Sequence, residues 1–130
     1  IPIKKEHNTS EKIEKYNENI FESIKHIDEN DNEFWYAREL MPLLEYTKWQ
    51  NFSKVIDKAK IACEQSNNNA LEQFTDVSKP IIGGNGNIQN SIDYKLSRYA
   101  CYLIAQNGDS RKQVIALAQT YLAIQTRNLV

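Results

Sequence analysis

The sequence of 130 residues predicts a single α+β domain that is mainly helical, with about five helices, one small β-hairpin and a short aromatic strand. Apolar residues recur at spacings of three and four in several segments, which is the period of an amphipathic helix. Two β-prone segments flank residues 83–87, where glycine and asparagine tolerate the positive φ of a hairpin turn. Three consecutive aromatic residues, 34–36, favour a half-buried strand.

The first element is expected to be an amphipathic helix over residues 9–28. Its apolar stripe consists of Ile13, Tyr16, Ile20, Ile24 and Ile27. A polar loop over residues 29–33 leads into the aromatic strand. Leucines at 40, 43 and 44 then predict a short helix, with Pro42 in its first turn, where the missing N–H of proline matters least.

The sequence Thr47-Lys48-Trp49-Gln50 predicts the start of the next helix. A threonine followed three residues later by glutamine forms a capping box, in which each side chain bonds the other residue's backbone amide. The helix that it opens has one apolar stripe, formed by Phe52, Val55, Ile56, Ala59 and Cys63. With the preceding helix it forms either a helix-turn-helix unit or an ordinary αα-hairpin, and the ordinary hairpin is the commoner arrangement.

After this helix we expect a helical turn at residues 70–74 and then the hairpin, with strands at 77–82 and 88–94. Pro80 cannot donate to a strand ladder, so its strand belongs at an edge. Ser97 is expected to cap the following helix, and Asn107-Gly108 to end it.

Asp109 is expected to cap the last helix. The core stripe of this helix is predicted to be Val114, Leu117, Ala118, Tyr121 and Ile124. Ile115 and Leu122 form a second apolar edge, which needs a second partner. This edge would be covered by a missing C-terminal half, by a homodimer partner, or by the hairpin or first helix of the same chain.

The net charge of −1 hides an asymmetry along the chain. Residues 1–33 hold five lysines against nine acidic residues, a net charge of −4, whereas residues 34–130 hold eleven basic against eight acidic residues, a net charge of +3. We therefore divide the chain into an acidic N-terminal helix and linker, 1–33, and a mildly cationic domain, 34–130.

The sequence predicts neither catalytic residues nor a metal or cofactor site. Cys63 and Cys101 lie far apart on apolar helical stripes, as expected for buried thiols in a cytoplasmic protein, and with His7 and His26 they lack the spacing of zinc ligands. The glycine-rich turn lacks the Gly-Lys-Ser/Thr ending of a phosphate-binding loop. Every apolar run falls short of the roughly 18 residues of a membrane span. A non-enzymatic protein without a membrane partner is therefore expected.

Aromatic and cationic residues are interleaved in two stretches, 34–52 and 93–109. This mixture suits a surface that touches nucleic acid, because rings stack on bases and cations meet phosphates. Each of these residues also has an alternative role that does not involve nucleic acid. A tryptophan can pack in the core, a lysine can be solvated, and Arg98 can form an ion pair with Asp93 or Asp109. The candidate nucleic-acid contacts are Lys48, Trp49, Lys54, Lys79, Arg98, Arg111 and Lys112.

The same stretches carry a resemblance to a known family. The strings FWYAREL, YTKWQNF and DYKLSRYACYLIAQNGD, with residues 55–63 and 116–127, resemble the DNA-damage-inducible protein D (DinD) family. The N-terminal region of that family is related to the Bro-N domains of phage antirepressors. Two positions depart from the family pattern, since Glu45 stands where glycine is expected and Ser110 where proline is expected.

The resemblance implies a bacterial protein of the DNA-damage (SOS) response that acts on DNA repair. Its partners would be single- or double-stranded DNA, a RecA-type recombinase filament, or both. Family members are longer than this chain, which implies that a C-terminal half is missing. The alternative is a phage-type antirepressor or a sequence-specific duplex DNA-binding domain.

Overall fold

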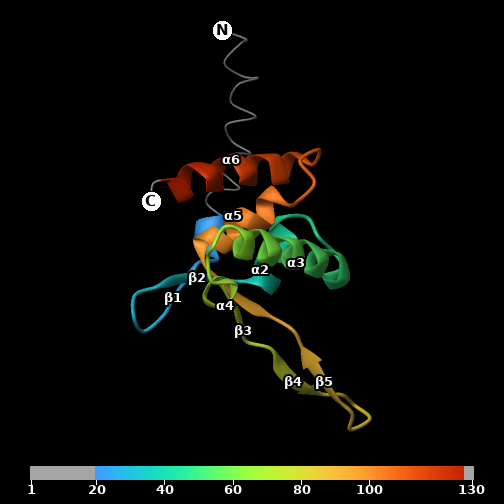
Figure 1. Ribbon diagram of the computed structural model, residues 1–130. Helices are drawn as coiled ribbons and strands as arrows, with labels where there is room; N and C mark the ends of the chain where they lie inside the picture. The colour runs from blue at the N-terminus through green and yellow to red at the C-terminus, as the bar shows by residue number, and fades with distance from the viewer. Residues whose placement is uncertain (1–19, 128–130) are drawn as a thin grey trace.

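The structure is a computed structural model that describes residues 20–127 (Figure 1). Residues 20–23 are helical and lead into the first strand. The elements that follow along the chain are β1 His26–Ile27, β2 Glu33–Tyr36, α2 Ala37–Leu43, α3 Trp49–Gln65, α4 Ala70–Gln73, β3 Phe74–Asp76, β4 Lys79–Ile82, β5 Ile88–Ser91, β6 Tyr94–Leu96, α5 Arg98–Gln106 and α6 Gln113–Arg127.

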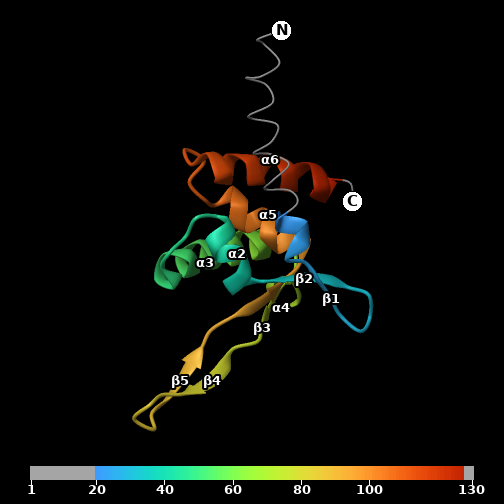
Figure 2. The same cartoon turned by 180° about the vertical axis from the view of Figure 1, so that it is seen from behind.

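The body of the molecule is layered, with helices on one face of a small antiparallel sheet. The sheet has four strands in the order β1-β2-β6-β3. Helix α5 lies at the centre, between α6 and the sheet, and it also contacts α3 (Figures 1 and 2). Strands β4 and β5 pair only with each other in a second sheet, and this ribbon projects away from the body.

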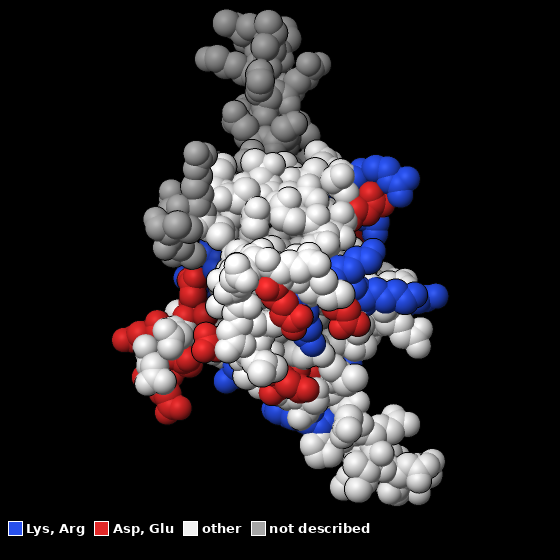
Figure 3. Space-filling view, viewed as in Figure 1, with Lys and Arg blue, Asp and Glu red and all other residues white. Residues whose placement is uncertain are grey.

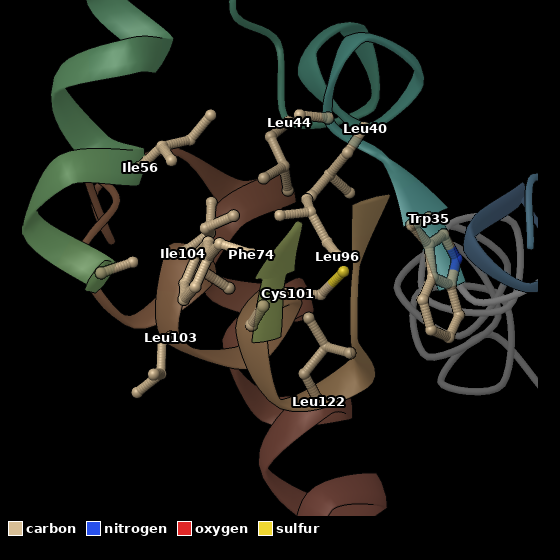
Figure 4. Close-up of a cluster of buried hydrophobic side chains, with 14 of the residues drawn as sticks. Trp35, Leu40, Leu44, Ile56, Phe74, Leu96, Cys101, Leu103, Ile104 and Leu122 are labelled. Carbon is tan, nitrogen blue, oxygen red and sulfur yellow. The ribbon is translucent and has the colours of Figure 1, made fainter. Parts of the chain in front are cut away.

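The core fills the space between the sheet and the helices (Figure 4). Along β2 the side chains alternate, so Trp35 points into the core while its neighbours point to the other face. Trp35 lies opposite Leu96 of β6, which in turn lies opposite Phe74 of β3. The helices, with Leu44 just after α2, supply the other large buried side chains of the core, which include Leu40, Phe52, Ile56, Ile104, Ile115 and Leu122.

The fold class predicted from the sequence is wrong in its β content. Residues 20–127 form six strands in two antiparallel sheets, where we expected one hairpin and one aromatic strand. The aromatic strand and the hairpin are present as β2 and the β4–β5 ribbon. The missed strands, β1, β3 and β6, have only two or three residues each. Such short strands show no readable alternation of apolar and polar residues, and they form because a neighbouring strand pairs with them.

The predicted helix at 9–28 ends earlier than expected. Residues 9–19 lie outside the described part of the chain, residues 20–23 are helical, and His26–Ile27 form a strand. Backbone pairing explains the change, since His26 lies opposite Phe34 and Ile27 opposite Glu33. The Asp28 carboxylate accepts the backbone N–H groups of Asn30 and Asn32 at 2.8 and 2.9 Å and closes the intervening loop.

Two predicted helix starts are also wrong. Helix α3 begins at Trp49, so Thr47 lies one residue outside its N-cap, Lys48, and no capping side-chain bond forms there. Asp109 Oδ1 accepts the Arg111 N–H at 3.0 Å in a turn that precedes α6, and the helix starts only at Gln113. Ser97 does cap α5, since its Oγ accepts the Ala100 N–H at 3.0 Å. A side chain caps a helix only if the backbone enters that helix at a suitable angle. The local sequence does not specify that angle.

Pro42 also lies elsewhere than predicted, in the last turn of α2. The turn that follows requires a left-handed backbone at Glu45, where φ is 63°. Its N–H donates to the Pro42 carbonyl at 3.0 Å, and the next N–H donates to the Met41 carbonyl at 3.1 Å. Glu45, which stands where the family pattern has glycine, therefore adopts a conformation that glycine adopts without strain.

Replacing Glu45 with glycine is expected to stabilise the protein by about 0.5–1 kcal/mol. The left-handed conformation costs a residue with a Cβ about 1–2 kcal/mol, and the greater freedom of glycine in the unfolded chain offsets part of the gain. Urea unfolding measures the change. Lys58→Gly, at an exposed position in the middle of α3, is the control and should destabilise by a similar amount. Equal destabilisation by both substitutions would contradict the prediction.

The apolar faces of α6 differ in part from those predicted. Val114, Ala118 and Tyr121 of the predicted core stripe do pack against the core, but they are only partly buried. Ile115 and Leu122 are 0% and 2% exposed, whereas Ile124 of the predicted core stripe is 56% exposed. Helix α5 covers the Ile115 edge, and a Cβ on Gly108 would lie 3.0 Å from Ile115 Cγ2. The edge that suggested a second partner is therefore buried within this chain.

Candidate nucleic-acid interface

Two segments that carry predicted cations meet at Tyr46, which follows α2. Lys48 is exposed two residues further on, and the α5–α6 loop brings Lys112 to the same ring, with its Nζ 5.2 Å from the ring centroid. Arg111 is the adjacent residue in that loop. We call Lys48, Arg111 and Lys112 the Tyr46 cluster. Figure 3 shows basic side chains, with some acidic ones among them, along the right-hand edge of the molecule, and mainly acidic side chains on the opposite side, over the β1–β2 loop.

Arg111 is already paired within its own loop. Its guanidinium donates to both oxygens of Asp109, at 2.9 and 3.0 Å, and its side chain is 89% exposed. Hydrogen bonds from the Arg111 side chain and backbone hold the pKa of Asp109 at about 2, so this carboxylate is charged at neutral pH. Asp109 also raises the pKa of Tyr46, although burial of the ring contributes more. Lys48 and Lys112 therefore carry most of the net charge of the cluster.

The Trp49 ring packs against the protein and is not an open surface on which a base could stack. Its ring is half-buried and packs edge-on against Phe52, with 5.9 Å between centroids. The Arg38 guanidinium covers it at 3.9 Å from the ring centroid. Arg38 also donates from Nε to the Ile92 carbonyl at 2.9 Å. Arg38 was missed as a candidate, although it lies within one of the strings that resemble the family, because its neighbours in space are distant in sequence.

Lys54 and Lys79 lie apart from each other. Lys54 is exposed on the outer face of α3, which also carries Lys58 but alternates with the acidic residues Asp57 and Glu64. Lys79 is the first residue of β4, at the base of the projecting ribbon. The mixed charge on α3 gives its outer face less attraction for phosphate than the Tyr46 cluster has.

Arg98 belongs to the core. Its side chain is only 9% exposed, and its guanidinium meets the carboxylates of Glu22 and Glu33 at 2.9 and 2.7 Å. Tyr121 Oη donates to Glu22 at 2.6 Å. Burial alone would lower the pKa of Arg98, but the hydrogen bonds to Glu33 and Glu22 raise it overall. Its donors are thus occupied, and the ion pair uses partners other than Asp93 or Asp109, which the sequence suggested.

The described residues show no arrangement for metal binding or for crossing a membrane. Within 20–127, no group of three or more His, Cys, Asp or Glu residues is placed to hold a metal ion, and no helix is both long and apolar enough to be a membrane span. Cys63 and Cys101 are free and buried, as the sequence predicted. Burial raises the pKa of both thiols, which keeps them protonated and unreactive at neutral pH.

Comparison with known proteins agrees with the resemblance found in the sequence. The chain is 46% identical over 107 residues to DNA damage-inducible protein D of Escherichia coli (strain K12), which covers 82% of this chain and 39% of that protein. No solved structure is significantly similar to the chain. The BRO family, N-terminal domain, matches residues 23–123. The chain therefore belongs to the BRO family and carries its N-terminal domain, in a form like that of DNA damage-inducible protein D.

Proposed function

We propose that this chain is a non-enzymatic, cytoplasmic regulatory module that binds DNA in a bacterial DNA-damage (SOS) response. The observation that carries the proposal is its 46% identity to DNA damage-inducible protein D across most of the chain. The chain spans 39% of the length of that relative.

The Tyr46 cluster is the part of the surface that we assign to phosphate contact. Lys48 and Lys112 are exposed, and the pairing of Arg111 with Asp109 reduces the charge that Arg111 can offer. About two phosphates would then be neutralised, which corresponds to a slope of roughly −2 when the logarithm of affinity is plotted against the logarithm of salt concentration. The expected affinity is modest and depends on salt.

Replacing Lys112 with glutamate is expected to weaken DNA binding about fivefold at low salt and to reduce the salt slope by about one, since one phosphate contact is lost. Fluorescence polarisation with labelled single-stranded and duplex oligonucleotides, at several salt concentrations, measures both quantities. Lys58→Glu is the matched control, because it makes the same charge change at an exposed site outside the cluster. Equal weakening by the two substitutions would argue against the assignment, and a slope of zero for the unaltered chain would exclude phosphate contact.

A sequence-specific duplex binder or phage-type antirepressor is the second candidate. It is favoured by the position of Lys48 at the N-cap of α3, which makes that end of the helix cationic and exposed, as in a recognition helix beside a groove. A marked preference for duplex over single-stranded oligonucleotides in the same titration would support it.

A RecA-type recombinase filament is the protein partner that the family resemblance suggests. Sedimentation of the chain with such filaments on single-stranded DNA, compared with DNA alone, tests this partner. We do not propose a homodimer through Ile115 and Leu122, because α5 covers them.

A further inference from the structure

The ribbon formed by β4, β5 and their turn, residues 79–91, presents large apolar side chains to solvent. We call it the arm. Ile81, Ile82 and Ile88 are 52%, 75% and 71% exposed. The arm extends away from the body in both views (Figures 1 and 2). A two-stranded hairpin with exposed isoleucines is marginally stable by itself in water, so such a segment suits contact with another molecule.

The base of the arm is held firmly on the body. The Asp93 carboxylate Oδ1 accepts the N–H groups of Arg38 and Tyr94 at 3.0 and 2.8 Å. Val77 N–H donates to the Asp93 carbonyl at 3.0 Å, and Arg38 Nε donates to the Ile92 carbonyl at 2.9 Å. These bonds set the direction of the arm before any ligand binds, which reduces the entropy cost of binding.

The composition of the arm points to nucleic acid. Residues 77–92 contain no Asp or Glu, and their single charged residue is Lys79. Figure 3 accordingly shows the far end of the arm, at the lower right, without acidic or basic side chains. The polar side chains are mostly amides, at positions 85, 87, 89 and 90. Amides pair with the edge of adenine, isoleucine can contact the thymine methyl group, and no carboxylate is present to repel phosphate.

The strand register distributes these groups over both faces of the arm. Residues directly opposite each other in an antiparallel pair share a face. Ile81 lies opposite Gln89 on one face. Ile82 lies opposite Ile88 on the other face, which also carries Asn90 two pairs further along. Each face therefore combines an apolar group with an amide, which is the combination that reads A·T base pairs in the major groove.

We propose that the arm enters the major groove of duplex DNA and gives the chain its preference for particular sequences. The inference rests on the DNA binding proposed above. The major groove is wide enough for a two-stranded ribbon. Arg38 joins the base of the arm to Trp49, which directly follows Lys48 of the Tyr46 cluster. The arm and the cluster are thus fixed relative to each other, so that the cluster holds phosphates while the arm contacts bases.

The test compares the 130-residue chain with an arm-shortened variant in which Asn-Gly replaces residues 81–89. Asn-Gly closes a two-residue hairpin turn between Pro80 and Asn90, and an unchanged thermal midpoint would show that the body still folds. Selection from a pool of random duplexes is expected to give the intact chain a preferred sequence, bound about tenfold more tightly than a scrambled duplex. The variant is expected to bind both duplexes with the weaker affinity.

Dimethyl sulfate protection identifies the groove, since the reagent methylates guanine N7 in the major groove and adenine N3 in the minor groove. We expect arm-dependent protection of N7 at guanines beside the contacted A·T pairs, and no protection of adenine N3 within those pairs. Ile82→Ser with Ile88→Ser should also lose the sequence preference, whereas Ile124→Ser, at a similarly exposed isoleucine of α6, should keep it.

The inference would be overturned if the arm-shortened variant kept the sequence preference, if the intact chain had none, or if protection fell on adenine N3. Each of these outcomes leaves salt-dependent DNA binding in place. Failure of the intact chain to bind any DNA would instead overturn the proposed function together with this inference, so the two failures are distinguishable.

Discussion

Replacing Trp35 with alanine is expected to lower the free energy of unfolding by about 3–5 kcal/mol, the largest effect of any single substitution considered for this protein. The side chain is 0% exposed and stacks on Phe21 with 4.5 Å between ring centroids. Its Nε1 donates to the Phe21 carbonyl at 2.8 Å. Alanine would leave a large cavity and remove this hydrogen bond. The loss of stability therefore has three causes: less apolar surface is buried, a cavity remains, and a hydrogen bond is lost.

Urea unfolding followed by circular dichroism measures this loss. Tyr36→Ala is the neighbouring control, because Tyr36 points to the opposite face of β2 and is only half-buried; about 1 kcal/mol is expected for it. Trp35→Phe keeps an aromatic ring but loses the N–H donor, and it remains informative if the alanine variant does not fold, with an expected loss of about 1–2 kcal/mol. Similar losses for Trp35→Ala and Tyr36→Ala would contradict the described packing.

Replacing Arg98 with alanine is expected to destabilise the fold by about 2–3 kcal/mol. Removing one partner of a buried ion pair leaves the other charge without compensation and costs about 3–5 kcal/mol. The carboxylates of Glu22 and Glu33 are about a third exposed, so water would lower that cost. The guanidinium also lies 5.0 Å from the centroid of the Trp35 ring, and that packing would be lost as well.

Arg111→Ala is the matched control for this substitution, because Arg111 also pairs with a carboxylate but is exposed. It is expected to change stability very little, because exposed ion pairs contribute little. Equal effects of the two substitutions in urea unfolding would show that Arg98 contributes no more than a surface ion pair.

The pH dependence of stability is a second measurement that tests the role of Arg98. Burial opposes ionisation of Glu22, but hydrogen bonds from Arg98 and Tyr121 lower its pKa below the ordinary value of 4.5. A carboxylate with a lowered pKa stabilises the fold above its ordinary pKa and loses that contribution as the pH falls through the lowered value. The difference in stability between the unaltered chain and Arg98→Ala should therefore narrow below about pH 4.5. A difference that stays constant down to pH 3 would indicate that packing alone produces it.

The longer elements could be predicted from the sequence because their patterns repeat over several turns. The stripe of α3, the Ser97 cap of α5 and the glycine-rich turn of the arm are all local features, and each is present in the structure. The strands β1, β3 and β6 could not be predicted, since a strand of two or three residues depends on its neighbour for pairing.

The candidate site shows the same difference between features that the local sequence predicts and features that only folding produces. Exposed lysines such as Lys48 and Lys112 are readily identified in a sequence, and the structure brings Lys112 to the ring of Tyr46, two residues before Lys48. Arg98 has the same residue type as Arg111, but it is buried because Glu22 and Glu33, which are 76 and 65 residues away in the chain, surround its guanidinium. Arg38 likewise gains its place beside Trp49 and Ile92 only through folding.

From the sequence alone we could identify the family, the order of the main helices, the projecting hairpin and the buried free cysteines. These properties depend on residue identity and on spacings within a few turns of chain. Only the tertiary structure decided which face of α6 is buried, which cations remain available to a ligand, and that the arm is held by Asp93 and Arg38. The physical reason is that burial and ion pairing depend on contacts between residues far apart in the chain, whose positions follow from packing as a whole.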